Sequence, residues 1–381
     1  MRDSPMINAS EILALLAEQR NVVVAGPPGT GKSMLLGEVA ALFESQAGES
    51  APEYSAEASV PIPALTGARL AKTIGKVGNR RVFRSVLHQS SKYREFLTGM
   101  MPDARAEAAP GKFRVTEGIL YKASEFAKRA DHAALVIIDE INRGPAVQVF
   151  GGSIVAMEGD KRLGPGGKRR PSTQYFELLD PNTGDLIEYA FPESLYLLAA
   201  MNQADVSVEP LDVAFLRRWA PLTLEPSSSV LREYFGIGAD EGDLLPESPL
   251  SREHVLQATV RAFDAVNKRI ALGRGPQFQI GHGMLMPPGG MPSDLTSVLS
   301  ALVAVWKVLK NHIDEVFFGD VRGVAVVLNA SLGIPENPYS LAERSFGDAP
   351  KAEIEGPVSV GPDEIYGLMR ALATSELPID V

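Results

Sequence analysis

Short apolar runs alternate with stretches of helical periodicity between residues 9 and 200. Each run is four to six residues long, which suits strands buried on both faces of a parallel sheet. The runs lie at residues 22–25, 82–87, 135–138 and 195–200, and a further short strand is predicted at residues 113–117. Apolar residues three and four positions apart predict helices at residues 9–19, 34–43, 120–130 and 147–158.

The pattern becomes helical after about residue 226. Residues 250–272 have helical spacing, and a single apolar stripe follows them. The stripe consists of Leu295, Val298, Leu299, Leu302, Trp306, Leu309, Ile313, Val316 and Phe317. We predict that this stripe is the core of a helical region. Residues 333–362 are rich in Pro, Gly and Glu, which predicts a linker or extended arm before a helix at residues 363–373.

Composition narrows the classes of protein. The chain has 381 residues, enough for two to three domains, and its net charge of -10 argues against a general nucleic-acid binder. It has no cysteine, which excludes disulfides and thiolate metal sites and fits a reducing compartment, so we expect a cytoplasmic protein. The first residues lead into an amphipathic helix rather than a secretory signal, and no apolar segment is long enough to predict a membrane span.

The first apolar run ends in a glycine-rich loop. The loop matches the spacing G-x-x-x-x-G-K-S/T, with Gly26, Gly31, Lys32 and Ser33 at the fixed positions. The predicted nucleotide-binding segment also includes Pro27, Pro28, Gly29, Thr30 and Met34. Such a loop places backbone N–H groups around a polyphosphate at a helix N-terminus, while Lys32 adds a charge and Ser33 an oxygen for Mg²⁺. The alternative, a turn without a ligand, is disfavoured because spacing and strand-helix context agree.

A second site follows the run at residues 135–138, where Asp139 and Glu140 emerge from a predicted buried strand. The pattern is typical of a Walker B strand. We expect Asp139 to complete the Mg²⁺ shell opposite Ser33, and Glu140 to polarise the attacking water, because phosphoryl transfer depends on positioning and charge neutralisation. Without the phosphate loop, the same pattern would indicate only a strand with a solvated end.

Polar residues follow the run at residues 195–200. We expect Asn202 to lie at the tip of a strand beside the Asp139 strand, and we predict that it senses the γ-phosphate. The alternative is a turn residue, the more common role of a lone Asn. Arg217 and Arg218 end a short predicted helix and suit a γ-phosphate from a neighbouring subunit. The alternative for the arginine pair is a surface salt bridge.

A glycine-rich basic loop spans residues 161–172. Its cations are Lys161, Arg162, Lys168, Arg169 and Arg170. Most charge runs are solvated loops, and this is the first interpretation. The alternative is a contact in a ring pore, with a partner, or with DNA.

These residues together resemble the AAA+ NTPases, and within them the McrB family, the motor subunits of modified-cytosine restriction systems. The general likeness rests on the phosphate loop, Asp139-Glu140, Asn202 and the arginine pair. The narrower likeness rests on five phrases between about residues 21 and 320. They are His88-Gln89-Ser90 with Tyr93 and Phe96, Ile138 to Arg143, Met201-Asn202 with Ala204-Asp205 and Ser207, Phe278 to His282, and Phe317 to Asp320.

The resemblance implies an α/β nucleotide-binding domain at residues 1–226, with a parallel sheet covered by helices on both faces. It further implies a helical lid at residues 227–332. The resemblance does not cover residues 333–381, which we expect to be a C-terminal extension that could dock on a neighbour or partner. His282 reaches the nucleotide by family position, and a packed or capping histidine is the alternative. Gln203 and Val206 depart from the family phrase. Only about twenty residues precede the first strand, so we expect no N-terminal DNA-reading domain.

We therefore predict a ring-forming NTPase motor that uses Mg²⁺, most simply a hexamer, with an arginine acting on the next subunit. We expect ATP rather than GTP, although McrB uses GTP. The expected partner is a McrC-like nuclease or another effector in a restriction or anti-phage defence system, with DNA contacted only through the partner or pore loops. A MoxR-type ATPase that remodels a protein without DNA, and a nucleotide-gated scaffold with hardly any turnover, remain alternatives.

Overall fold

The computed structural model describes residues 7–45, 74, 78–103, 112–204, 211–347 and 349–374. The chain divides into two compact units, which we describe separately. The sheet unit comprises Ser4–Ala25 and Lys32–Leu224, and the helical unit comprises Gly26–Gly31 and Glu225–Val381. Among the described helices, none combines the length and apolar character that a bilayer span requires.

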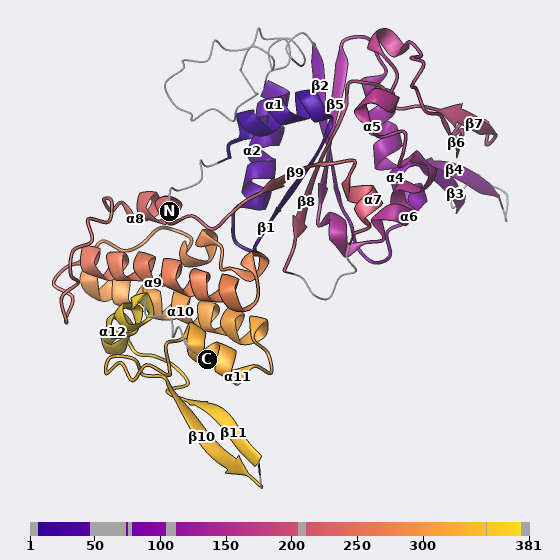
Figure 1. Ribbon diagram of the computed structural model, residues 1–381. Helices are drawn as coiled ribbons and strands as arrows, with labels where there is room; N and C mark the ends of the chain where they lie inside the picture. The colour runs from indigo at the N-terminus through magenta and orange to yellow at the C-terminus, as the bar shows by residue number, and fades with distance from the viewer. Residues whose placement is uncertain are drawn as a thin grey trace. The chain divides into compact units, whose positions relative to one another are not determined.

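A five-stranded parallel sheet is the centre of the sheet unit (Figure 1). Its strands, in spatial order, are β2 (Asn79–Val86), β5 (His132–Asp139), β8 (Leu195–Asn202), β1 (Asn21–Gly26) and β9 (Ala220–Thr223). The predicted α/β class is confirmed. The strand of Asn202 lies beside the strand of Asp139, as predicted, because β8 pairs with β5 in parallel.

Helices cover both faces of this sheet, because alternate residues of each strand point to opposite sides. In β5, Leu135 and Ile137 pack with α1 and α2, whereas Val136 and Ile138 pack with α5 and α6. Figure 1 shows these helices on the two sides of the strands. The bounds are α1 (Ala9–Gln19), α2 (Lys32–Ser45), α4 (Tyr93–Phe96), α5 (Ile119–Ala127), α6 (Ala146–Phe150) and α7 (Val213–Leu216).

Two antiparallel hairpins lie outside the main sheet, β3 (Thr98–Pro102) with β4 (Phe113–Glu117) and β6 (Phe176–Leu179) with β7 (Leu186–Tyr189). The predicted strand at residues 113–117 is therefore present, whereas the β6–β7 hairpin was not expected. The predicted helix at residues 147–158 is wrong: α6 ends at Phe150, because Gly151 has a φ of +48° and turns the chain into short 3₁₀ segments.

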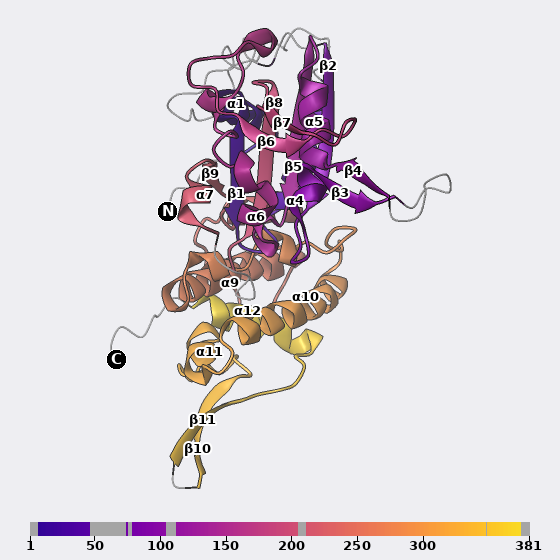
Figure 2. The same cartoon turned by 90° about the vertical axis from the view of Figure 1, so that its right-hand side faces the viewer.

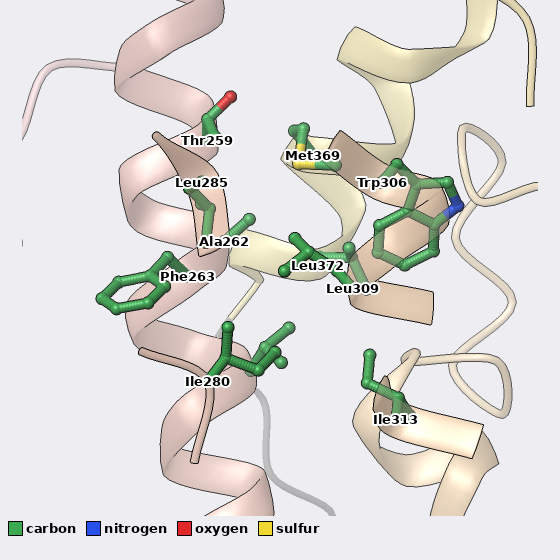
Figure 3. A pocket seen from close by; sticks show the side chains of 11 residues that line it. Thr259, Ala262, Phe263, Ile280, Leu285, Trp306, Leu309, Ile313, Met369 and Leu372 are labelled. Carbon is green, nitrogen blue, oxygen red and sulfur yellow. The ribbon is translucent and has the colours of Figure 1, made fainter. Parts of the chain in front are cut away.

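Five helices build the core of the helical unit. They are α8 (Ser228–Phe235), α9 (Arg252–Gly273), α10 (Leu295–Val316), α11 (Val321–Val327) and α12 (Pro362–Ala373). The apolar stripe of α10 is largely buried against α9, α11 and α12. A small apolar cavity of about 20 Å³ remains between these helices, lined by residues such as Val266, Ile280, Trp306 and Leu372. Figure 3 shows the side chains that line this cavity.

The C-terminal region is structured differently from the expected linker or extended arm. The strands β10 (Ser340–Phe346) and β11 (Ala349–Glu355) pair in antiparallel and extend away from the helices in Figure 2. The predicted C-terminal helix is present as α12 and packs along α9 with Ile365, Leu368 and Leu372 buried. This helix therefore belongs to the core of the helical unit.

Candidate functional site

The proposed active-site residues follow the carboxyl ends of three neighbouring strands. In the sheet order, β1 lies next to β8, and β8 lies next to β5. These strands end at Gly26, Asn202 and Asp139. Ligands of open α/β sheets bind beyond the carboxyl ends of the strands, where the strand order reverses. β1 lies at this reversal, because its two neighbours in the sheet, β8 and β9, both come later in the sequence.

The phosphate loop contains left-handed backbone conformations that favour glycine. Gly29 and Gly31 have φ values of +79° and +81°, and the buried Thr30 hydroxyl donates to the Pro27 carbonyl over 2.9 Å. The Pro28 and Gly29 carbonyls accept hydrogen bonds from the backbone N–H groups of Gly281 and Gly283, over 3.0 and 2.8 Å.

These two hydrogen bonds orient the loop's own donors. In a trans peptide the C=O group points opposite to the following N–H group. Holding the Pro28 and Gly29 carbonyls toward Gly281 and Gly283 therefore turns the N–H groups of Gly29 and Thr30 the other way. Successive backbone N–H groups that point into the same concave surface form an anion-binding site.

The side chains at the start of α2 carry the expected charge and oxygen. Lys32 is 8% exposed, and burial lowers its pKa to about 8, against the opposing effect of the Glu140 and Asp139 carboxylates. The ammonium is therefore charged at neutral pH and lies near both carboxylates. The side chain of Met34 is 68% exposed, so it is open to a ligand.

Ser33 and Asp139 face each other across the end of the sheet. The Ser33 hydroxyl donates to the Asp139 carboxylate over 3.5 Å. Two oxygen ligands at neighbouring positions of an octahedral Mg²⁺ are roughly 2.9 Å apart, so this pair fits one ion with a small adjustment. The described residues contain no group of three or more acidic, histidine or cysteine side chains that could hold a metal ion. Such an open site suits Mg²⁺, which keeps water and substrate oxygens as its other ligands.

Glu140 is held in a polar network. Its backbone lies in the left-handed region with a φ of +52°, and its N–H donates to Asp139 over 3.0 Å. The Asn202 amide donates to the Glu140 carboxylate over 2.7 Å, and Arg143 lies 3.4 Å from the other carboxylate oxygen. The Asn142 amide donates to the Asn202 carbonyl over 2.9 Å. Sequence reasoning assigned no role to Asn142 or Arg143, although both lie in the phrase Ile138 to Arg143.

The two arginines after α7 differ. Arg218 forms an ion pair of 2.9 Å with Glu158, and its side chain is only 7% exposed. Arg217 is exposed, and no ion pair or side-chain hydrogen bond joins it to another described residue. Of the two predicted roles, the salt bridge therefore fits Arg218, and a contact with another subunit fits Arg217.

His282 has a local partner. Its Nδ1 accepts the backbone N–H of Ser227, the residue that caps α8, over 3.3 Å. Burial lowers the pKa of His282, so the neutral ring that this hydrogen bond requires is favoured. The geometry matches the capping alternative, and a nucleotide contact by His282 stays a prediction.

The basic loop is not the uniformly solvated loop that the sequence predicted. Arg162 is fully buried, Arg170 pairs with Glu193 over 2.6 Å, and Lys161 pairs with Asp160 over 2.7 Å. Lys168 and Arg169 are exposed. Most of the expected positive patch is thus neutralised or buried, which weakens the case for DNA contact by this loop.

The sequence is similar to known proteins. Residues 66–219 match the AAA domain family of the dynein-related subfamily. The chain is 30% identical over 223 residues to the type IV methyl-directed restriction enzyme EcoKMcrB subunit of Escherichia coli K12, covering 58% of this chain and 39% of that protein. It is 28% identical over 209 residues to the type II restriction enzyme BsuMI component YdiS of Bacillus subtilis 168, covering 53% and 56%. The matches thus span about half the length of these relatives or less.

Among solved structures, PCH-2 of C. elegans aligns at a TM-score of 0.30 and 14% identity. The alignment covers 78% of this chain and 67% of that one. A likeness of this size adds nothing to the family match and the five-stranded parallel sheet, on which the fold assignment depends.

Proposed function

We propose that this chain, whose residues 66–219 match an AAA domain and whose sequence resembles McrB, hydrolyses nucleoside triphosphates in active sites completed by a second copy of itself. The place of Arg217 supports this proposal. Arg217 precedes β9, whose first residue, Ala220, pairs with Val22 at the beginning of β1, whereas Lys32 and Ser33 lie after the end of β1. A six-residue strand is about 20 Å long, farther than an arginine side chain reaches. Arg217 therefore serves another subunit's nucleotide in this proposal.

A surface that offers an arginine at one edge and a nucleotide at the other makes head-to-tail contacts. Such contacts form a ring when the rotation closes, and we propose a hexamer. An arginine supplied by a neighbour raises the rate of phosphoryl transfer by roughly 10³ to 10⁵. Hydrolysis in each site would then depend on assembly.

In the proposed reaction, water attacks the γ-phosphorus as the bond to the β-phosphate oxygen breaks, and a nucleoside diphosphate leaves. The loop N–H groups and Lys32 hold the phosphates, and Ser33 with Asp139 would hold Mg²⁺, which neutralises charge on the phosphate oxygens. Glu140 polarises the water. Asn202 and Arg143 fix the Glu140 carboxylate from two sides, so its direction is set before substrate arrives.

ATP is the proposed substrate, and turnover with ATP and GTP should be compared directly, because the phosphate loop contacts no base. We further propose that the ring drives a McrC-like nuclease or another effector, since both curated relatives are restriction-enzyme components. Capture of the chain together with the products of neighbouring genes tests this partner. A protein-remodelling partner without a nuclease would instead favour the MoxR-type alternative.

Purified wild-type protein and Glu140→Gln test the chemistry. The variant keeps the shape and the Asn202 hydrogen bond but loses the charge that polarises water. We expect nucleotide binding to be retained and turnover to fall by at least about 10²-fold. Equal turnover in the two proteins would refute the assignment of Glu140.

Mixed subunits test the shared site. Lys32→Ala subunits lack a working site but keep Arg217, and Arg217→Ala subunits have the opposite defect. We expect each to be inactive alone and a mixture to recover turnover. Arg169→Ala, which removes another exposed arginine, is the matched control and should behave as wild type. No recovery in any mixture would contradict a site shared between subunits.

A further inference from the structure

A buried arginine lies at the edge of the sheet opposite the proposed active site. Arg162 donates through Nε and Nη2 to the Met157 carbonyl over 2.9 and 2.8 Å, and through Nη2 to the Asn21 side-chain oxygen over 2.6 Å. It also donates to the Leu195 carbonyl. Asn21 begins β1 and Leu195 begins β8, so one guanidinium joins the first residues of two strands to the turn after α6.

Stability alone does not explain this arginine. Burial, together with the nearby charge of Arg20, lowers the pKa of Arg162 to about 9, so the group stays charged at neutral pH. None of its hydrogen bonds in the described part of the chain goes to a carboxylate. A buried charge without a counter-charge is costly, and apolar side chains in the same space generally stabilise a protein equally well. The planar fork of donors instead fixes the positions of several acceptors at once.

Asn21 extends this arrangement to the segment that carries Arg217. Because a guanidinium only donates, Arg162 must face the oxygen of the Asn21 amide, and the NH₂ group is turned the other way. That NH₂ group donates to the Met157 and Arg218 carbonyls, each over 3.0 Å. Asn21 is 1% exposed, and three hydrogen bonds hold its amide.

Further contacts hold the segment that carries Arg217. Glu158, which follows Met157, binds the Arg218 guanidinium over 2.9 Å. Phe215 and Trp219 are buried and pack on each other and on Phe150. Arg217 is the exposed residue between these anchors, so its backbone is fixed on both sides while its side chain is free to meet another molecule.

We propose that Asn21 and Arg162 are positioning residues that hold Arg217 in the geometry required at the neighbouring subunit's nucleotide. This rests on the proposed shared active site. The arrangement also links neighbouring sites of a ring. Asn21 begins β1, and the other end of β1 carries the phosphate loop of the same subunit. A displacement of β1 would move the arginine that serves the next site.

Asn21→Asp tests the proposal with little change in shape. The carboxylate still accepts from Arg162 and supplies the missing counter-charge, but it places an acceptor against the Met157 and Arg218 carbonyls where two donors were. We therefore expect a folded protein with unchanged nucleotide affinity and a lower kcat. A misplaced reacting group of this kind costs on the order of 10²-fold in rate.

Subunit mixtures separate positioning from general damage. The reference mixture is Lys32→Ala with Arg217→Ala. Asn21→Asp is added either to the Lys32→Ala subunit, which donates the arginine, or to the Arg217→Ala subunit, which accepts it. We expect a loss on the order of 10²-fold in the first mixture and little change in the second. Equal losses in both, or no loss in the first, would overturn the positioning role.

Two further variants complete the design. Arg162→Lys keeps the charge but cannot bridge the same acceptors, so a partial loss from the donating subunit is expected. If Asn21→Asp does not fold, Arg162→Lys carries the test of the proposal. Glu158→Gln, which weakens the second hold on Arg218, should likewise reduce turnover only from the donating subunit. A failed reference mixture would refute the shared site, and the positioning role with it, whereas a working reference without donor-specific loss would refute only the positioning role.

Discussion

Replacing Gly281 with alanine asks whether the backbone around it organises the phosphate loop. Gly281 has a φ of −71°, which any residue adopts, so only space excludes a side chain there. An added Cβ would lie 2.1 Å from the Gly29 carbonyl carbon and 2.4 Å from the Pro28 and Gly29 carbonyl oxygens. These are backbone atoms, which cannot turn aside as a flexible side chain does.

The size of the effect follows from this contact. Carbon atoms in contact are about 3.5–4.0 Å apart, so the two backbones must separate by more than about 1 Å. That separation breaks the hydrogen bonds of 3.0 and 2.8 Å from Gly281 and Gly283. At about 0.5–1.5 kcal/mol each, the free energy of unfolding should fall by roughly 1–3 kcal/mol. Each 1.4 kcal/mol that is also lost from the nucleotide complex weakens binding about tenfold.

Urea unfolding and a fluorescence titration with nucleotide measure the two quantities. Gly37→Ala is the matched control, because Gly37 lies in α2 and an added Cβ there meets no atom within 4 Å. It should raise the free energy of unfolding by up to about 1 kcal/mol and leave nucleotide affinity unchanged. Wild-type affinity in Gly281→Ala would refute the idea that these hydrogen bonds orient the loop's N–H groups.

Three other substitutions test separate parts of the molecule. Val266→Ile fills part of the apolar cavity of about 20 Å³ and should raise the free energy of unfolding in urea by up to about 0.8 kcal/mol, whereas Val266→Ala should lower it by about 2 kcal/mol. His282 has a lowered folded pKa, so the unfolded state binds its proton first and stability should fall as pH drops below about 6.5; His282→Gln, which keeps an acceptor for Ser227, should show a shallower fall. Ser33→Ala should raise the Mg²⁺ concentration needed for half-maximal turnover, and an unchanged Mg²⁺ titration would contradict the metal role of Ser33.

The sequence was sufficient for four of the five strands of the sheet and for the placing of Asp139 and Asn202 at their carboxyl ends, because both depend on local pattern, whereas β9 was not predicted. A fully buried strand is an apolar run of fixed length, and β5 was predicted at 135–138 within its actual bounds of His132–Asp139. Parallel strands expose their carboxyl ends at one edge, so Asp139 and Asn202 could be placed together once their strands were identified. Spacing alone did not reveal that Arg143 reaches back to Glu140, because that contact depends on the left-handed backbone of Glu140.

Predictions failed where a residue's environment comes from distant segments. The helix expected at 147–158 ends at Phe150. The next residue is Gly151, where an added Cβ would lie 2.8 Å from the ring of Tyr93, a residue far away in sequence. The β10–β11 hairpin was missed because half of its strand residues are polar, and among their described side chains Leu341 and Ile354 are the ones that pack on the helical core.

Arg162 shows most clearly why a charge in a loop cannot be assigned from composition. Five cations at residues 161–172 suggested one surface, yet the structure separates them into an exposed pair, two ion-paired residues and one buried group. The acceptors of Arg162 belong to Asn21, Met157 and Leu195, which no sequence window contains together. A buried charged group is tolerated where it fixes several backbone segments, and in the proposed arrangement the segments that Arg162 fixes hold the exposed Arg217 in place.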